Sequence, residues 1–362
     1  MNVVVLATAS RIGGALTIYK QFLEHLKDEI GNDKYYILVN EAVPKPTIEG
    51  VQYFVIDTTS TKNRLLFDFY SGKKMMKEKG FAPDVIISLQ NTGLFHSNLS
   101  QVIYYHQSIP LYPQSWSLFK KKERTLFYYK YIYPFFVKCT RNKKTQYVVQ
   151  IPFIKKGMVE KFHVPANHVH TMFPDVEDIN ADAIEAYDWA DGNMHFLYPA
   201  NGSSYKMHIT LIKALKQLND KRIKLHLTIA KGAYPVIDQM IAEAGLNDSI
   251  IRDGAITHTQ LLSMYKGSAG LLFPSTIETI GLPLLEAAAF GTPIIAADVD
   301  YAHQVLGGYE GVEFLSPYDD SKWAEAIKEV INNPKHYQPI ERQKSSWPRF
   351  FELVRNSAEK KV

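Results

Sequence analysis

The stretch that decides the fold runs from Phe273 to Asp298 and reads FPSTIETIGLPLLEAAAFGTPIIAAD. A buried strand ends at Phe273 and a loop follows it. A helix is predicted from Leu282, because Pro283 suits the first turn of a helix. Gly281 lets the backbone approach a ligand closely just before that helix. A strand, a glycine-containing loop and a helix in this order indicate one βα unit of a parallel sheet.

The loop before this helix carries candidate groups for binding a diphosphate. The amides of Thr279, Ile280 and Gly281 are predicted to lie at the positive end of the helix, where phosphates bind well. Glu278 lies in the loop, and Glu286 follows eight positions later, predicted within the first helical turn. This spacing would place one carboxylate near a sugar and the other near a ribose. Either glutamate alone is also what a helix N-terminus favours without any ligand.

The rest of the chain repeats the alternation of short apolar strands and helices, which indicates parallel sheets with helices on both faces. The sequence predicts strands at 2–7, 35–40, 52–57, 85–89, 102–105, 146–150, 195–199, 224–230, 270–273 and 292–297. Helices are predicted at 14–27, 73–79, 209–218, 235–244, 259–265, 282–290 and 321–332. The acidic stretch 173–191 lacks a strand pattern and is interpreted as a linker.

We therefore expect an α/β protein of two doubly wound, Rossmann-like domains that face each other across a cleft. The first domain is predicted over residues 1–173 and the second over 174–340. Residues 341–362 are predicted as a C-terminal helix that crosses back to the first domain.

Composition narrows the class of protein. The 362 residues are 46% hydrophobic and 22% charged, which supports two real cores and excludes a disordered chain. The single cysteine, Cys139, excludes a disulfide framework and a multi-cysteine metal site. The N-terminus has no secretory pattern and no stretch is long and apolar enough to span a bilayer, so we expect a cytoplasmic protein. The net charge of +4 is too small to indicate a nucleic-acid partner.

The segment from Glu278 to Glu286, within PSTIETIGLPLLEA and followed by GTPIIAAD, resembles the signature of family-4 retaining glycosyltransferases of the GT-B fold, in glycosyl transferases group 1. The resemblance extends back through residues 253–256, 260–265 and 198–208. The backbone around Ala255 and Ile256 resembles the turn with which this family contacts the base of the donor. The first half of the chain matches this family only in its pattern of strands and helices.

This resemblance implies roles for individual residues. Glu286 would bind the donor ribose, Glu278 the donor sugar, and Lys206 the diphosphate oxygens. Asn201 stands where the family usually has an arginine, which removes one positive charge from the phosphate clamp. The resemblance and the loop chemistry together predict a set of donor-binding residues. This set is Gly13, Gly14, Asn201, Lys206, Ala255, Ile256, Glu278, Thr279, Ile280, Gly281, Leu282 and Glu286.

Two positions in the first half complete this set. Gly13 and Gly14 open the first helix, where their flexibility lets a diphosphate or an acceptor approach, although such a pair is as often only a turn. His106 follows strand 102–105 and so lies at the carboxyl edge of the sheet, where ligands bind. It matches a family histidine that lines the reaction centre, and we predict catalytic roles for His106, Lys206 and Glu278.

No metal and no cofactor beyond the donor substrate is predicted. Asp298 and Asp300 are interpreted as a cap at the end of a strand, and His168 and His170 lack a third ligand. Residues 115–144 carry nine basic side chains, one acidic one and many aromatic rings. This basic aromatic segment favours contact with an anionic membrane surface on the inner face of the cytoplasmic membrane. The alternative is a helix with its rings packed inward and its lysines solvated.

The resemblance implies a retaining hexosyltransferase that uses a UDP- or GDP-sugar. Its acceptor would be a glycan or a lipid-linked molecule in bacterial surface polysaccharide synthesis, such as O-antigen, lipopolysaccharide or capsule. Two alternatives stay open from the sequence. One is a sugar-nucleotide epimerase on the same fold, and the other is a catalytically silent partner of another transferase.

Overall fold

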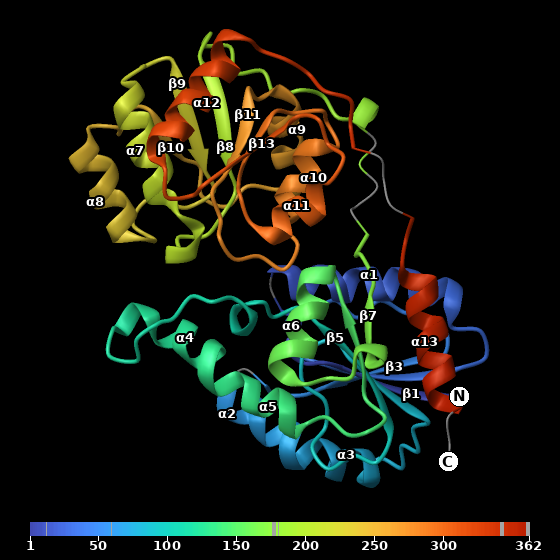
Figure 1. Cartoon of the computed structure of the whole chain (residues 1–362). Coiled ribbons are helices and arrows are strands. Elements are labelled where there is room, and N and C mark those ends of the chain that lie inside the picture. Colours follow the sequence, from blue (N-terminus) through green and yellow to red (C-terminus); the bar gives the residue numbers. More distant parts are fainter. Residues whose placement is uncertain (12, 59, 176–178, 180, 341–343, 360–362) are drawn as a thin grey trace. The chain divides into compact units, whose positions relative to one another are not determined.

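A computed structural model describes residues 1–11, 13–58, 60–175, 179, 181–340 and 344–359 (Figure 1). The chain divides into two compact units. Unit 1 comprises Met1–Asp175 with Gln343–Val362, and unit 2 comprises Val176–Arg342. The end of the chain therefore belongs to the same unit as its beginning.

Unit 1 is built on a seven-stranded parallel sheet of order β3-β2-β1-β4-β5-β6-β7. Its central strands are continuous runs of buried residues, as a sheet covered on both faces requires. The three-residue strand β7 is absent from the sequence prediction because so short a run carries no readable period. The strands are β1 Asn2–Ala7, β2 Lys34–Val39, β3 Val51–Val55, β4 Val85–Ser88, β5 Ser100–Tyr105, β6 Gln146–Val149 and β7 Val169–Thr171.

Helices cover both faces of this sheet. One core joins the sheet to α1 and α13 through Val3, Phe22 and Phe350. The other face packs Val4 and Ile86 against the α2–α3 region. The helices are α1 Gly13–Glu29, α2 Thr61–Leu66, the π-helical η1 Phe67–Ser71, α3 Gly72–Glu78, α4 Arg124–Phe127, the π-helical η4 Tyr128–Ile132, α5 Tyr133–Cys139, α6 Pro152–Phe162 and α13 Trp347–Glu359.

Unit 2 has a six-stranded parallel sheet of order β10-β9-β8-β11-β12-β13. The sequence prediction missed β10 and β13, which are short edge strands with partly exposed residues. The strands are β8 Met194–Tyr198, β9 Ile223–Leu227, β10 Ile250–Arg252, β11 Gly270–Phe273, β12 Ile294–Ala297 and β13 Val312–Leu315. The helices are α7 His208–Leu218, α8 Pro235–Ala244, α9 His258–Gly267, α10 Leu282–Ala288, α11 Asp300–Leu306 and α12 Asp320–Asn332.

One interpretation was wrong at the end of β12. Asp300 does not close the strand but begins helix α11, where a carboxylate suits the positive helix end. Asp298 pairs with His303 at 2.7 Å on the same short segment. Asp298 and Asp300 thus belong to a strand-to-helix junction.

Both sheets share one strand order. Counted within its own unit, each contains the order 3-2-1-4-5-6 of doubly wound dinucleotide-binding folds, and unit 1 adds β7 as a seventh strand at its edge. The order reverses between β1 and β4 in unit 1 and between β8 and β11 in unit 2. Ligands of such sheets bind outside the carboxyl ends of the strands at this reversal. Within the residues that the structure describes, no helix has the length and apolar character to cross a bilayer.

Candidate functional site

The loops after β8 and β11 form the reversal point of unit 2 and are tied together. The backbone amide of Thr276 donates to the carbonyl of Tyr205 at 2.9 Å, and its hydroxyl donates to the same oxygen at 3.1 Å. Tyr301 donates from its hydroxyl to the carbonyl of Ser275 at 2.6 Å. These bonds fix the backbone on either side of the predicted donor residues.

Lys206 and Glu278 meet at this point. The Lys206 ammonium donates to the Glu278 carboxylate, and the lysine is only 9% exposed. The same nitrogen lies 5.6 Å from the ring centre of Tyr205 and 5.9 Å from that of Phe273. The two residues predicted to hold diphosphate and sugar therefore neutralise one another in this structure. An anionic ligand at Lys206 would compete with Glu278 for the ammonium.

Glu286 is held by a separate pair of side chains. One carboxylate oxygen lies 3.0 Å from Nε2 of His258, and the other accepts a hydrogen bond from the hydroxyl of Tyr265 at 3.3 Å. Burial, followed by the nearby Glu286 charge, raises the pKa of Tyr265 well above its usual range, so the phenol stays a donor. Glu286 lies in the second turn of α10, whose first turn has no acidic residue, so its predicted place in the first turn was wrong.

The residues before α10 form a bend that glycine favours. Gly281 is the N-cap residue, with φ of 71° in the left-handed region, and no side chain caps the helix. Leu282 begins the helix, which is seven residues long, and Ile280 is buried beneath the loop. Thr279 is also engaged in an interaction of its own.

The loop after β8 shows what Asn201 does in place of an arginine. Its side-chain oxygen accepts a hydrogen bond from the amide of Ser203 at 3.0 Å, so it shapes the loop and brings no charge. Sequence reasoning gave no role to His208, the first residue of α7. Its ring is buried against Tyr198, and Nε2 has no hydrogen-bond partner among the described residues. Burial, and then the charge of Lys206, lowers the pKa of His208 to about 3.

The turn of residues 253–256 is anchored by a chain of buried imidazoles. Asp253 lies 3.1 Å from Nδ1 of His226, and Nε2 of His226 lies 2.9 Å from Nδ1 of His195. The chain ends at Asp191, 2.8 Å from Nε2 of His195, and the Trp189 ring stacks on His195 with ring centres 4.0 Å apart. Burial lowers the pKa of His195, and Asp191 opposes this shift. The histidines lie on neighbouring strands, and sequence reasoning missed them.

This anchored turn presents the two residues predicted to contact the base. Gly254 adopts a left-handed φ of 74°, which turns the chain after Asp253. Ala255 is exposed and Ile256 is half-buried. The backbone predicted to contact a base is therefore accessible on unit 2.

The matching edge of unit 1 is a closed network around Gln90. Its side-chain amide donates to Asp68 at 2.8 Å, and its side-chain oxygen accepts from the hydroxyl of Thr8 at 2.8 Å. Thr92 donates to the second Asp68 oxygen, also at 2.8 Å. Burial raises the pKa of Asp68 to about 6, while Arg64 and these donors oppose the shift. Sequence reasoning missed this network because it joins η1 to the loop after β4.

His106 stands beside this network. Its backbone amide donates to Asn91 at 2.6 Å, and its Nε2 lies 3.4 Å from the Asn91 side-chain nitrogen. Burial, and then the charge of Arg64, lowers the pKa of His106 to about 4, so the ring is neutral at pH 7. Gly13 begins α1 at a φ of 58°, and an added Cβ at Gly13 or Gly14 would meet nothing within 4 Å.

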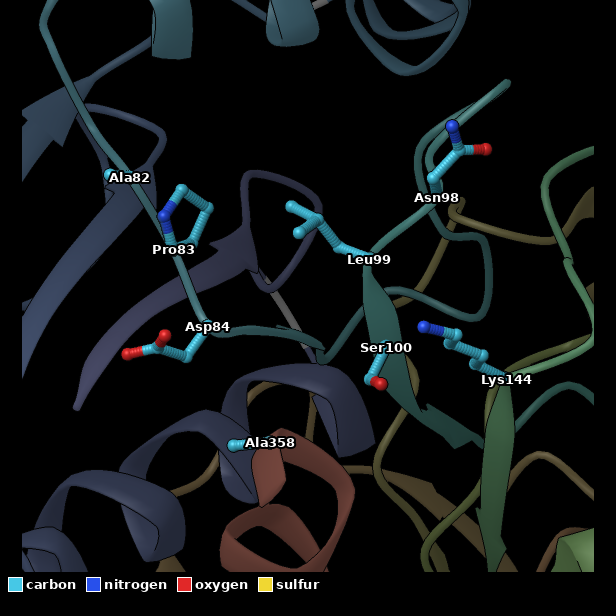
Figure 2. A pocket seen from close by; sticks show the side chains of 8 residues that line it. All are labelled: Ala82, Pro83, Asp84, Asn98, Leu99, Ser100, Lys144 and Ala358. Atoms are coloured by element: carbon cyan, nitrogen blue, oxygen red, sulfur yellow. The ribbon is translucent and has the colours of Figure 1, made fainter. Parts of the chain in front are cut away.

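Two further features lie away from these edges. A cavity of about 390 Å³ is lined by Asp84, Ser100 and Lys144 at the amino ends of β4 and β5, the opposite edge of the sheet (Figure 2). His168 contacts the carbonyl of Thr145 and His170 the side chain of Gln146, so they do not converge. Across the described ranges, no group of three or more His, Cys, Asp or Glu side chains is placed to hold a metal ion.

Comparison with known proteins agrees with this geometry. Residues 181–347, which contain Lys206, Glu278 and Glu286, match the family described as glycosyl transferases group 1. This match covers most of unit 2. The O-antigen chain mannosyltransferase RfbU of Salmonella typhimurium is 24% identical over 194 residues, which cover 53% of each protein. A D-inositol 3-phosphate glycosyltransferase of Pseudarthrobacter chlorophenolicus is 26% identical over 171 residues, 44% of this chain and 40% of that protein. The chain thus spans about half the length of the curated relatives it matches, or less.

Solved structures establish the fold of the whole chain. The lipopolysaccharide glycosyltransferase WaaG aligns over 100% of this chain and 96% of its own, with a TM-score of 0.65 at 12% identity. The galactosyltransferase WaaB aligns over 99% and 95%, with a TM-score of 0.60 at 16% identity. Anabaena HepE, solved with UDP and glucose, aligns over 92% and 90%, with a TM-score of 0.66 at 14% identity. The expected GT-B fold is confirmed.

Proposed function

We propose that this protein is a retaining hexosyltransferase that uses a UDP- or GDP-sugar and a glycan or lipid-linked acceptor in bacterial surface polysaccharide synthesis. The observation that carries the proposal is the Lys206–Glu278 ion pair at the reversal point of the unit that matches the family. The names of RfbU and WaaB, and the ligands of HepE, support the substrate class.

Donor binding begins with an exchange of partners at Lys206. The diphosphate oxygens replace the Glu278 carboxylate on the ammonium, because two negative charges so close to one cation compete for it. Glu278 is then released to accept hydrogen bonds from the hydroxyls of the donor sugar. Since Asn201 adds no charge, Lys206 and the loop amides of residues 279–281 carry the diphosphate.

Glu286 binds the ribose hydroxyls with an orientation fixed by His258 and Tyr265. In the transfer step the bond between the anomeric carbon and the phosphate oxygen breaks while the acceptor hydroxyl bonds to that carbon on the same face. The hydroxyl proton passes to the departing phosphate. Lys206 stabilises the charge that develops there, which is the largest electrostatic demand of the step. Because Nε2 of the neutral His106 ring faces the Asn91 amide group, Nδ1 carries the proton and donates a hydrogen bond to a sugar oxygen. No metal is required.

The basic aromatic segment, residues 115–144, is the proposed contact with the inner face of the cytoplasmic membrane. Phe119, next to the basic run 120–122 in the sequence, is 92% exposed, and Phe135 in α5 is 61% exposed. The alternative of rings packed inward holds for Tyr133, which is buried, but not for these two. Rings at the headgroup level and lysines against anionic lipid form such a surface.

Vesicle sedimentation tests this surface. Replacing Lys120, Lys121 and Lys122 by Glu should abolish binding to anionic vesicles at low salt. The matched control replaces Lys74, Lys77 and Lys79, exposed lysines in and just after α3 of the same unit, and should retain binding. Equal loss in both variants, or no vesicle binding by the wild type, would contradict the proposal.

Product analysis of the purified full chain tests the reaction itself. Incubation with UDP- and GDP-sugars should release nucleoside diphosphate slowly, and faster when a suitable acceptor is added. The transferred sugar should keep its anomeric configuration. Isomerised donor without transfer would identify an epimerase. Binding without any turnover would identify a silent partner.

A further inference from the structure

Unit 1 contains a basic cavity that the proposed transfer does not use. It has a volume of about 410 Å³ and is lined by residues at the start of β6 and at the ends of α5 and α6. Among the described residues no Asp or Glu lines it. Its basic and aromatic side chains are Lys138, Arg141, Lys143, Tyr147, His163 and His168, and the polar Asn142 and Thr145 also line it. We call this set the basic cavity.

Two of these side chains are held in place by the backbone. Arg141 donates from one terminal nitrogen to the carbonyl of Phe162 at 2.7 Å, at the end of α6. Nδ1 of His168 lies 3.1 Å from the carbonyl of Thr145, so Nδ1 carries the proton and donates. Nε2 of His168 is thereby left available for a ligand. The guanidinium and the imidazole are therefore positioned before any ligand arrives.

Three other side chains have unused capacity. Lys138 and Lys143 are exposed, and in the described part of the chain they make no hydrogen bond or ion pair. Tyr147 is 1% exposed, and its hydroxyl has no hydrogen-bond partner within the described residues. Burial raises the pKa of this phenol, so it remains protonated. Since buried polar groups are nearly always paired, the free hydroxyl indicates a missing partner.

Stabilisation of the negative carboxyl ends of helices does not explain why these side chains gather at the basic cavity. Cations suit the carboxyl ends of α5 and α6, and Arg141 does satisfy a carbonyl at the end of α6. That role uses one group of six. It leaves Lys138 and Lys143 without a partner and gives no reason for an unpaired hydroxyl on Tyr147.

We propose that the basic cavity binds a phosphomonoester dianion, as a site of its own in addition to the proposed donor site. Three permanent cations without a carboxylate match a doubly charged ligand, and an arginine fork matches the geometry of phosphate oxygens. The cavity lies at the amino edge of the unit 1 sheet, whereas the proposed donor residues lie at the carboxyl edge of the unit 2 sheet. The phosphate comes either from a soluble sugar or glycerol phosphate or from a lipid headgroup.

The soluble arm uses full-length protein with Lys206→Met, so that the donor site cannot contribute. Glycerol 3-phosphate is titrated while the ring signals of ¹⁵N-labelled His168 are followed, with glycerol as the uncharged control. We expect the ring signals to shift and to saturate as glycerol 3-phosphate is added. Arg141→Gln should lower the affinity at least about tenfold, and Tyr147→Phe should lower it several-fold. The exposed pair Lys138→Gln and Lys143→Gln should weaken binding without disturbing the fold. The matched pair Lys77→Gln and Lys79→Gln, exposed and outside both the cavity and the basic aromatic segment, should change nothing.

The lipid arm compares phosphatidylcholine vesicles that contain phosphatidic acid with vesicles of equal charge that contain phosphatidylglycerol. A lipid source predicts a preference for the monoester headgroup that Arg141→Gln removes. The control pair Lys77→Gln with Lys79→Gln should keep this preference. A response in the soluble arm alone identifies a soluble ester. The proposal is overturned if neither arm responds, or if the matched outside pair reduces binding as much as the cavity pair.

Discussion

The carboxyl edges of the two sheets hold their acidic groups in opposite ways. In unit 2, Glu278 faces the ammonium of Lys206, and both side chains keep some access to solvent. In unit 1, Asp68 is 3% exposed and receives its hydrogen bonds from an amide and a hydroxyl. The edge of unit 2 therefore has charges that a ligand can exchange. The edge of unit 1 is a closed network beside the neutral ring of His106, suited to uncharged hydroxyls.

The largest effect is expected at the exchangeable charge. Lys206→Met should reduce kcat/KM for donor hydrolysis by about 100-fold or more, since one preorganised group on a developing charge contributes on that scale. Steady-state kinetics with the best donor sugar measure it. Lys213→Met, an exposed lysine on α7, is the matched control and should behave like wild type. Equal kinetics for the two variants would remove Lys206 from the site.

Substitutions of Glu278 and Glu286 should cause two different defects. Glu286→Gln should weaken nucleotide binding about tenfold, because the ribose loses a charged acceptor. Glu278→Gln should lower kcat while free nucleoside diphosphate still binds, and more tightly than to wild type, because Lys206 has lost its competing carboxylate. Calorimetry gives the nucleotide affinity of each variant, and steady-state kinetics give its kcat, so the two effects are measured separately. If both variants bind nucleoside diphosphate like wild type, the division of roles is wrong.

The closed network of unit 1 should affect how the free energy of unfolding depends on pH. The pKa of Asp68 is raised from 3.8 to about 6, so its contribution to stability is complete below pH 4 and is lost as the pH rises through 6. The loss amounts to about 3 kcal/mol. Asp68→Asn should remove this part of the pH dependence, even where it also changes the free energy of unfolding by a constant amount at every pH. Denaturant unfolding between pH 4 and 7 measures this free energy for both proteins. Parallel curves of the free energy against pH would contradict the raised pKa of Asp68.

The smallest expected effect is that of a chelator. Because Lys206 and the loop amides offset the diphosphate charge, transfer should persist at an unchanged rate in excess EDTA. An assay with and without EDTA, followed by added Mg²⁺ or Mn²⁺, decides this. Loss of activity that a divalent ion restores would show that unit 2 needs a metal.

The same contrast explains what the sequence could predict. In unit 2 the motif 278–286 lies within one continuous strand, loop and helix, so local spacing alone brought its residues to one edge. Strand β11 and helix α8 were predicted with the bounds that the structure gives them. Lys206, 72 residues earlier, came only from the family resemblance, and its pairing with Glu278 came only from the structure.

In unit 1 the carboxyl edge of the sheet is assembled from turns that lie far apart in the sequence. Asp68 lies in η1, Gln90 follows β4 and His106 follows β5, and each residue type alone is common in a core. The buried contact of His195 with His226 was equally hidden, because it forms between neighbouring strands at positions 31 apart in the sequence. Short edge strands such as β10 were missed because three residues do not establish a period.

Calorimetric titration of wild type and Lys206→Met with UDP and GDP in the presence of EDTA tests directly whether Lys206 holds the diphosphate. We expect wild type to bind one of the two nucleotides with one site per chain. Lys206→Met should bind the same nucleotide at least about tenfold more weakly. Equal affinity for the two proteins, or no binding of either nucleotide by wild type, would contradict the claim that the diphosphate replaces Glu278 on Lys206.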